Sequence, residues 1–144
     1  ADFTCPACAD VQGVLTELRA EYGDRLRIVW KDLPHLDRIT GSRSLHLAAR
    51  CAQAQGKFWE FHDAVFAQAT HEDGALDALI RTAELNPRAF AACTERSTGA
   101  DRIDANIADA ERSGVTATPV FFVNGALLTD APSRSAFRAL LGNP

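Results

Sequence analysis

The chain has 144 residues, of which 47% are hydrophobic and 24% are charged, and its formal net charge is -4. This length and composition suit one compact domain with a core of its own, and the scattered, weakly acidic charge argues against a nucleic-acid surface. No run approaches the roughly 18 apolar residues of a spanning helix, and the first residues lack the pattern of a targeting signal. We therefore expect a soluble chain without such a signal.

The N-terminal part predicts a helix followed by a strand. Apolar residues recur at intervals of three and four over about 6–22, which predicts a helix that Gly23 ends. Apolar residues then alternate over 26–30, which predicts a strand that stops at Pro34.

The middle of the chain has helical periodicity throughout, with breaks at glycines and at Asn86-Pro87. Five helices are predicted there, which run from Leu45 to Gln55, Phe58 to Ala69, Leu76 to Leu85, Pro87 to Arg96 and Arg102 to Arg112. This pattern indicates a helical insertion.

The C-terminal part predicts a hairpin and a closing helix. Val120 to Val123 is short, β-branched and aromatic, which favours a strand. Asn124-Gly125 is a strong two-residue turn signal that leads into a second strand over 126–128. Ser133 then begins the last helix.

The most informative feature is the run Phe3-Thr4-Cys5-Pro6-Ala7-Cys8, at the predicted start of the first helix. The spacing brings the two sulfur atoms within disulfide range, and Pro6 suits the first helical position. The attacking species in disulfide exchange is a thiolate, which the positive end of a helix stabilises. We therefore interpret Cys5 as the nucleophile and Cys8 as the more buried resolving thiol.

The alternative interpretation of a C-x-x-C pair is half of a zinc site, which requires two further ligands. The remaining cysteines and histidines are scattered, with no second C-x-x-C and no histidine pair at ligand spacing. We favour the redox pair, and we expect neither a metal nor another cofactor.

The dipeptide Thr118-Pro119 precedes the predicted hairpin. One interpretation is a proline that merely begins a strand, where it removes no ladder hydrogen bond. The other is a cis peptide bond beside the cysteines, which would leave the Thr118 backbone free to pair with an extended substrate. Together with the cysteine pair, the dipeptide favours the cis bond.

Three blocks in this order resemble the DsbA-like branch of the thioredoxin superfamily, and the resemblance covers nearly the whole chain. The blocks are 2–8, then 48–52 with 55–63, and finally 114–125. The resemblance implies one α/β domain, a thioredoxin fold with a helical insertion, whose core is 1–40 and 114–144 and whose insertion is about 42–113. It implies catalytic roles for Cys5, Cys8 and Pro119, and substrate contacts for Thr118, Pro6 and Ala7.

The function that the resemblance implies is disulfide exchange with secreted proteins, through a mixed disulfide on Cys5, with donation as the expected direction. Reduction or isomerisation by the same fold is an alternative. A peptide-binding module with a structural Cys5–Cys8 disulfide is another, and Cys8 argues against a glutathione-dependent enzyme.

The resemblance also implies a setting and partners. It indicates a bacterial protein of the periplasm or cell envelope, or one that is secreted. The expected partners are unfolded or reduced secreted polypeptides and a redox partner, which we expect to be bound to a membrane. We expect no nucleic acid, and a monomer or weak dimer.

The chain departs from the family in two ways. Only residues 1–4 precede Cys5, so we expect the family's N-terminal central strand to be missing or truncated, which would expose two strand edges. The family's buried acidic residue would lie in that strand, and we assign it to no residue here. Ala7 stands where a histidine would stabilise the thiolate, which predicts a less oxidising pair.

Cys51 and Cys93 lie on the apolar faces of two predicted helices. They could be buried reduced thiols that behave as small hydrophobic residues. The rival interpretation is a structural disulfide, which an oxidising compartment favours and which some DsbA-like relatives possess. We favour the bond, whose closed loop would add roughly 4 kcal/mol of stability.

One predicted helix carries an aromatic cluster, which we interpret as core packing because it falls mostly on one face: Phe58, Trp59, Phe61 and Phe66. His62 within this helix and His35 after Pro34 are interpreted as structural histidines and not as catalytic bases.

Overall fold

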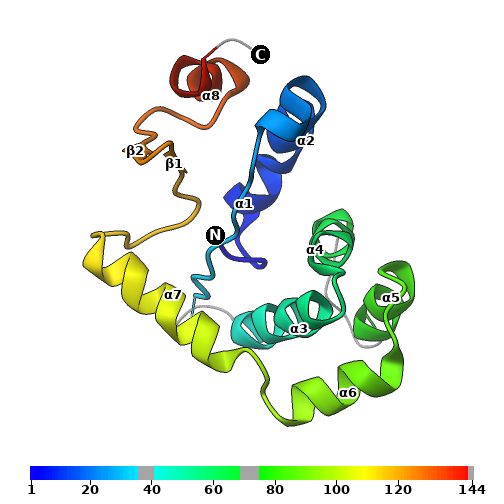
Figure 1. Cartoon of the computed structure of the whole chain (residues 1–144). Helices are drawn as coiled ribbons and strands as arrows, with labels where there is room; N and C mark the ends of the chain where they lie inside the picture. The colour runs from blue at the N-terminus through cyan, green and yellow to red at the C-terminus, as the bar shows by residue number, and fades with distance from the viewer. Residues whose placement is uncertain (36–40, 69–74, 143–144) are drawn as a thin grey trace.

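The computed structural model describes residues 1–35, 41–68 and 75–142, in which helices predominate and two short strands pair (Figure 1). The helices are α1 (Pro6–Asp10), α2 (Gln12–Tyr22), α3 (Ser42–Ala54), α4 (Phe58–Ala67), α5 (Ala75–Thr82), α6 (Pro87–Glu95), α7 (Ala100–Arg112) and α8 (Arg134–Leu141), with a 3-10 turn η1 (Gly23–Arg25). The strands are β1 (Phe122–Val123) and β2 (Ala126–Leu127).

Two hydrophobic clusters organise the molecule. The first is built mainly from α3 to α6 around the buried Phe61, and Phe3 and Trp30 reach it from the N-terminal part. The second joins α2, the hairpin and α8 through residues such as Leu18 and Phe137. In Figure 1 the N-terminus and α1 lie between these two groups of elements. The cysteine motif is thus held where the two halves of the molecule meet.

The helix predicted over 6–22 is interrupted, so that prediction was wrong at Val11. α1 ends at Asp10 and α2 begins at Gln12. The Gln12 side-chain amide donates a hydrogen bond to the Cys8 carbonyl oxygen at 2.6 Å. This carbonyl is the acceptor that the Gln12 N–H would use in a continuous helix, and such competition bends helices. α1 therefore carries the cysteine pair on a separate turn.

The five helices predicted in the middle are confirmed as α3 to α7, with ends shifted by a few residues. The predicted end of the second of them, at Ala69, lies outside the described residues. Gly99, just before α7, has φ 97° and approaches α3 so closely that a Cβ would lie 2.7 Å from the Arg50 Cβ. Only glycine tolerates this backbone and this contact. None of the helices in the described ranges is long and apolar enough to cross a membrane.

The segment 26–30 is extended but forms no ladder, so its predicted strand was wrong in its pairing. Within the described part of the chain, no backbone hydrogen bond joins residues 27–30 to another segment. Pairing occurs just beyond this segment. The Ala1 amino group donates to the Lys31 carbonyl at 3.0 Å, and the Leu33 N–H donates to the Ala1 carbonyl at 2.9 Å. This is the pattern of a parallel pair. Within the described residues, the backbone of this region pairs with Ala1 at Lys31 and Leu33.

A cavity of about 780 Å³ borders this segment. It is lined by residues 25–33, by Ala117 and residues 119–125, and by Cys8, Val11 and Leu15 among others. The segment 26–30 and the residues that lead into β1 thus line the same cavity.

The predicted hairpin is confirmed, although its first strand begins at Phe122 and not at Val120. Phe122 pairs with Leu127 and Val123 pairs with Ala126 in an antiparallel register. Asn124 and Gly125 have φ 51° and 86°, both positive, as a type I′ turn requires. This turn reverses the direction of the chain shortly after Pro119.

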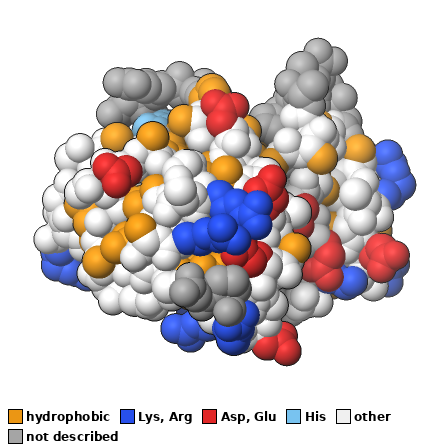
Figure 2. Space-filling model, turned by 90° about the horizontal axis from the view of Figure 1, so that it is seen from above, with side chains coloured by type: hydrophobic (Ala, Val, Ile, Leu, Met, Phe, Trp, Pro, Cys, Tyr) orange, Lys and Arg blue, Asp and Glu red, His pale blue; other side chains and the backbone are white. Residues whose placement is uncertain are grey.

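Ion pairs fasten α8 to α2. Glu21 accepts hydrogen bonds from the Arg134 Nε at 3.0 Å and from the Arg138 Nε at 2.6 Å. Ser133 caps α8 by accepting from the Ala136 N–H. On the face seen in Figure 2, acidic and basic side chains are interspersed. Such surface ion pairs each contribute little stability. The second hydrophobic cluster therefore contributes most of the free energy that holds α8 against α2.

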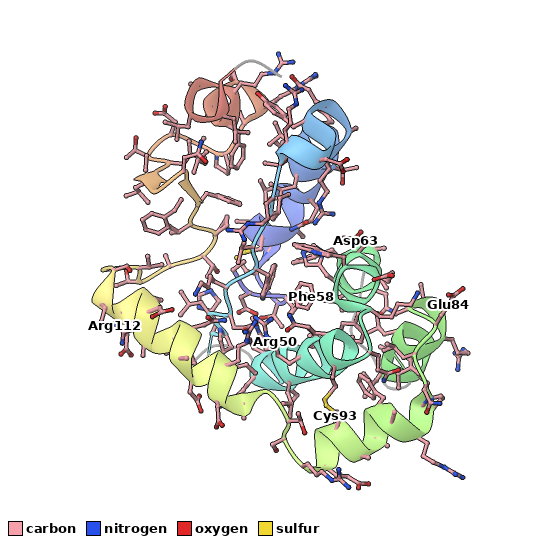
Figure 3. All side chains as sticks on the ribbon, viewed as in Figure 1. Arg50, Phe58, Asp63, Glu84, Cys93 and Arg112 are labelled. Carbon is pink, nitrogen blue, oxygen red and sulfur yellow. A yellow bond between two sulfur atoms is a disulfide. The ribbon has the colours of Figure 1, made fainter. Side chains whose placement is uncertain are left out.

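A disulfide joins Cys51 of α3 to Cys93 of α6, with an S–S distance of 2.04 Å (Figure 3). The aromatic cluster on α4 lies at the same core, as predicted, with Phe58 and Phe61 buried and Trp59 and Phe66 partly buried. The bond therefore links two helices that already share apolar contacts.

Removing this disulfide by the double substitution C51A/C93A should lower the free energy of unfolding by roughly 4 kcal/mol, because the unfolded chain regains the freedom of the loop that the bond closes. Urea denaturation monitored by circular dichroism measures the change. Both proteins should carry C5S/C8S, so that the other thiols do not contribute. A loss below about 1 kcal/mol would contradict the prediction.

Candidate active site

The two cysteines of the motif lie at the start of α1 in different surroundings. Cys5 is the N-cap, with extended backbone, and its carbonyl accepts hydrogen bonds from the N–H groups of Cys8 and Ala9 at 3.0 and 3.2 Å. Pro6 is the first helical residue, where its missing N–H costs nothing. Cys5 is 8% exposed and Cys8 1%, and both are free thiols. Cys5 is therefore the more accessible sulfur, beside the exposed Pro6 and Ala7.

The loop before β1 lies against the cysteine motif. The Thr118–Pro119 peptide bond is cis. The Cys5 Sγ donates a hydrogen bond to the Thr118 carbonyl oxygen at 3.4 Å, although 113 residues separate the two. Pro119 and Cys8 both line the cavity described above. The structure thus brings together the cysteine pair and the dipeptide that the sequence analysis singled out.

The Cys8 thiol is strongly affected by its surroundings. Burial raises the pKa of Cys8 to about 11, and hydrogen bonds from the Asp2 backbone and the Thr118 side chain oppose the shift only in part. A group with such a pKa is almost entirely protonated at neutral pH. Cys8 therefore cannot act as a nucleophile without losing a proton to a neighbour.

Asp2 is a site residue that the sequence analysis missed. Its carboxylate is fully buried and accepts hydrogen bonds from the N–H groups of Thr4 and His35, both at 3.0 Å, and from the Ser42 hydroxyl at 2.9 Å. Burial acts to raise the pKa of Asp2, but these bonds and one with His46 outweigh it, so that the pKa lies below its usual range. Asp2 stays ionised and fixes the loop that leads into the motif.

A second buried carboxylate, Asp32, lies behind Asp2, and His46 bridges the two. The His46 Nδ1 is 2.8 Å from Asp32 and its Nε2 is 3.3 Å from Asp2. Asp32 also accepts hydrogen bonds from the Arg50 Nε and the Asn106 side chain, each at 2.8 Å. Arg50 reaches from α3 towards the middle of the molecule (Figure 3). We call these five residues the buried polar network.

The charges of this network balance. Burial acts to raise the pKa of Asp32, but hydrogen bonds and charge from His46 and Arg50 more than reverse the effect and lower it to about 2. Both ring nitrogens of His46 face carboxylate oxygens, which only accept, so the ring carries two hydrogens and a positive charge. Two anions and two cations thus neutralise one another without solvent.

His35 lies closer to the cysteines than the sequence indicated. Its Nε2 is 2.8 Å from the Thr118 hydroxyl and 4.0 Å from an Asp2 carboxylate oxygen, and its side chain is 27% exposed. The two residues are 83 positions apart, so no local pattern could have revealed the contact. His35 therefore joins Asp2, Thr118 and the cysteines in one site.

Other candidate ligands do not gather in this way. Among the residues with a described position, no group of three His, Cys, Asp or Glu side chains is arranged to hold a metal ion. His62 lies within the aromatic core, where burial lowers its pKa, and its Nδ1 is 2.7 Å from an Asp63 oxygen. The chemistry that the site offers is that of two thiols, a histidine and a buried carboxylate.

Comparison with known proteins agrees with this geometry. A family model described as "Thioredoxin" matches residues 1–143. Among solved structures, a thioredoxin-like oxidoreductase from Silicibacter pomeroyi superposes with a TM-score of 0.85 at 24% identity, covering 98% of this chain and 80% of that one. Oxidised BdbD from Bacillus subtilis superposes with a TM-score of 0.76 at 18% identity, covering 98% and 82%.

The curated relatives carry another name. The Na⁺/H⁺ antiporter NhaA 3 of Salinispora tropica is 38% identical over 129 residues, which are 87% of this chain and 19% of the antiporter. The antiporter NhaA of Herminiimonas arsenicoxydans is 34% identical over 144 residues, which are 97% of this chain and 22% of the antiporter. The chain spans about a fifth of the length of these relatives.

Breaking the buried polar network should be costly. The substitution R50M should lower the free energy of unfolding by about 3–5 kcal/mol, because it leaves the Asp32 carboxylate buried beside one cation fewer. The matched variant R43M removes an exposed partner of Asp104 and should cost less than about 1 kcal/mol. Urea denaturation at pH 7 measures both, and equal losses would contradict the assignment.

Proposed function

The chain belongs to the thioredoxin family, and we propose that it is a thiol–disulfide oxidoreductase whose reactive pair is Cys5 and Cys8. Membership of the thioredoxin superfamily and the predicted thioredoxin fold are confirmed. The proposal rests above all on one observation, that Cys5 begins α1 with its sulfur 3.4 Å from the Thr118 carbonyl, next to a cis proline. The similarity to the thioredoxin-like oxidoreductase from Silicibacter pomeroyi supports it.

The proposed reaction passes through a mixed disulfide. A substrate thiolate attacks the Cys5 sulfur of the oxidised pair, and Cys8 leaves as a thiolate that takes up a proton. A second substrate thiolate then attacks the substrate sulfur of the mixed disulfide, and Cys5 leaves. The substrate has lost two electrons and the pair has gained them. Cys5, the N-cap of α1, is the sulfur that bonds the substrate.

Donation is the direction that we propose, because it is the direction that the resemblance to the DsbA-like branch implies. The burial of Cys8 acts in the same sense for the first step, because a protonated Cys8 does not attack the mixed disulfide and reverse it. Reduction or isomerisation remains the alternative within the same chemistry.

We further propose that the substrates are unfolded or reduced secreted polypeptides, which would contact Pro6, Ala7 and the Thr118 backbone. A redox partner, bound to a membrane, would reset the pair. The proposed location is extracytoplasmic in a bacterium, and the Cys51–Cys93 disulfide supports an oxidising compartment. We propose a monomer or weak dimer.

The antiporter relatives do not alter this proposal. The relatives named as Na⁺/H⁺ antiporters are about five times longer than this chain. The geometry of the part shared with them favours thiol chemistry at Cys5 and Cys8.

Trapping the intermediate tests the proposal. Reduced C8S protein, mixed with a polypeptide that contains a disulfide, should accumulate a mixed disulfide on Cys5, because the resolving thiol is absent. Intact-mass analysis of the acid-quenched reaction measures it. C5S should form no adduct, and wild-type protein should turn over without accumulating one. An adduct on C5S, or none on C8S, would refute the assignment of the nucleophile.

A redox titration tests the direction. Equilibration with glutathione, followed by thiol trapping and mass analysis, should give a potential for Cys5–Cys8 above that of thioredoxin, which is about -270 mV. A value at or below that of thioredoxin would instead assign reduction. A pair that stays oxidised throughout the accessible range would favour a structural disulfide and a peptide-binding module.

A further inference from the structure

The stretch 116–120, which carries Thr118 past the cysteine motif, is held by backbone hydrogen bonds only at its two ends. The Val115 N–H donates to the last turn of α7 at 2.8 Å, and the Phe121 carbonyl accepts from the Leu128 N–H at 2.9 Å. Between these bonds, no backbone–backbone hydrogen bond joins residues 116–120 to another described residue. The position of the Thr118 main chain therefore depends on contacts with side chains.

His35 makes one such contact. Its Nε2 is 2.8 Å from the Thr118 hydroxyl, which is hydrogen-bond distance whichever of the two atoms donates. The His35 backbone N–H donates to an Asp2 carboxylate oxygen at 3.0 Å. The same carboxylate accepts from the Thr4 N–H at 3.0 Å, in the turn just before Cys5. His35 is thus held by the N-terminal residues and in turn holds the Thr118 side chain.

These contacts form a closed ring that includes the Cys5 sulfur. The Thr118 carbonyl accepts from the Cys5 Sγ at 3.4 Å, and the Cys5 N–H donates to the Asp2 carbonyl at 3.3 Å. The ring therefore passes from Asp2 to His35, to Thr118, to Cys5 and back to Asp2. Without the contact between His35 and Thr118, the remaining link from Thr118 into the ring is the bond from the Cys5 thiol, which is a weak donor.

The surroundings of His35 suit a fixed side chain. Pro34, just before it, is buried, and the proline ring restricts the backbone there. The His35 side chain is 27% exposed, so water has limited access to its contact with Thr118. A hydrogen bond shielded from water is stronger than one in open solvent.

We propose that His35 is a positioning residue, which fixes the Thr118 main chain for pairing with an extended polypeptide substrate. The inference rests on the proposed function, in which the substrate contacts the Thr118 backbone while its sulfur bonds Cys5. A main chain that is already fixed loses less conformational freedom when the substrate binds. A small dithiol has no main chain to pair and makes no use of this anchor. The role requires a hydrogen bond from His35 and no transfer of a proton.

A comparison of two reductants tests this role. The oxidised protein is reduced either by an unstructured peptide with two cysteines or by dithiothreitol, and thiol trapping with mass analysis follows the Cys5–Cys8 pair. The substitution H35L removes the hydrogen bond and should lower kcat/KM for the peptide about tenfold, mainly through a higher KM, because binding to the fixed main chain is lost. The rate with dithiothreitol should change less than about twofold, because this reductant does not pair with the Thr118 main chain.

Further variants separate the hydrogen bond from the bulk of the side chain. H35Q and T118S keep a group that can hydrogen-bond, so both should stay within about threefold of the wild type. T118V removes the hydroxyl and should match H35L, and the double variant should be no worse than the worse single one, because both substitutions remove the same contact. The matched control T116V removes the hydroxyl of an exposed threonine in the same stretch and should leave both reactions unchanged.

A binding measurement separates the inference from the redox chemistry. C5S/C8S protein, titrated with the same peptide carrying serine in place of cysteine, should bind it about tenfold more weakly when H35L is added. Thermal unfolding of each variant identifies a general loss of structure, and T118V carries the same comparison if H35L does not fold. The role is contradicted if H35L leaves the peptide KM and this affinity unchanged, if it slows both reductants equally, or if the effects of H35L and T118V multiply. A wild-type pair that binds the peptide through His35 but does not exchange with it would instead contradict the proposed function.

Discussion

The balanced charge of the buried polar network is the constraint on which the rest of the structure depends. Removing four ionised groups from water is expensive, and the cost is met only when each finds its partner in good geometry. Asp2 comes from the N-terminus, Asp32 from the extended segment, His46 and Arg50 from α3 and Asn106 from α7. The network therefore specifies how the helical insertion sits against the segment that carries the cysteines, and a displaced element would leave a charge unpaired.

This constraint gives two neighbouring thiols opposite properties. Asp2 fixes the turn before the motif, so that Cys5 begins α1 and keeps a small exposed surface, whereas Cys8 is turned under it. Cys5 is the N-cap of α1 and lies beside the exposed Pro6 and Ala7. The environment of Cys8 is dominated by burial, which favours the thiol. The proposed function uses this asymmetry, because Cys5 is the sulfur that substrates can reach and Cys8 is the protonated sulfur beneath it.

The sequence allowed prediction of what depends on neighbours along the chain. The helices, the Asn124-Gly125 turn and the motif at the start of α1 all follow from local spacing and were found. Alternation over 26–30 predicted extended backbone correctly but not its pairing, which depends on a neighbouring strand. The buried polar network was missed because its members are far apart. Its one local signal was His46 and Arg50, four residues apart on a helix whose other buried residues are small: Ser42, Ala48, Ala49, Cys51 and Ala52.

The extended segment shows how side chains can replace a ladder. Residues 27–30 make no backbone hydrogen bond to another described segment, yet the Trp30 ring stacks on Phe3 with centroids 4.5 Å apart and its Nε1 donates to Asp32 at 2.9 Å. At the far end, the Leu33 N–H binds the Ala1 carbonyl and the His35 N–H binds Asp2. The end of the segment is thus tied to the residues just before the cysteine motif. The same contacts that replace the ladder therefore also hold the His35 ring 2.8 Å from the Thr118 hydroxyl, beside the cysteine motif.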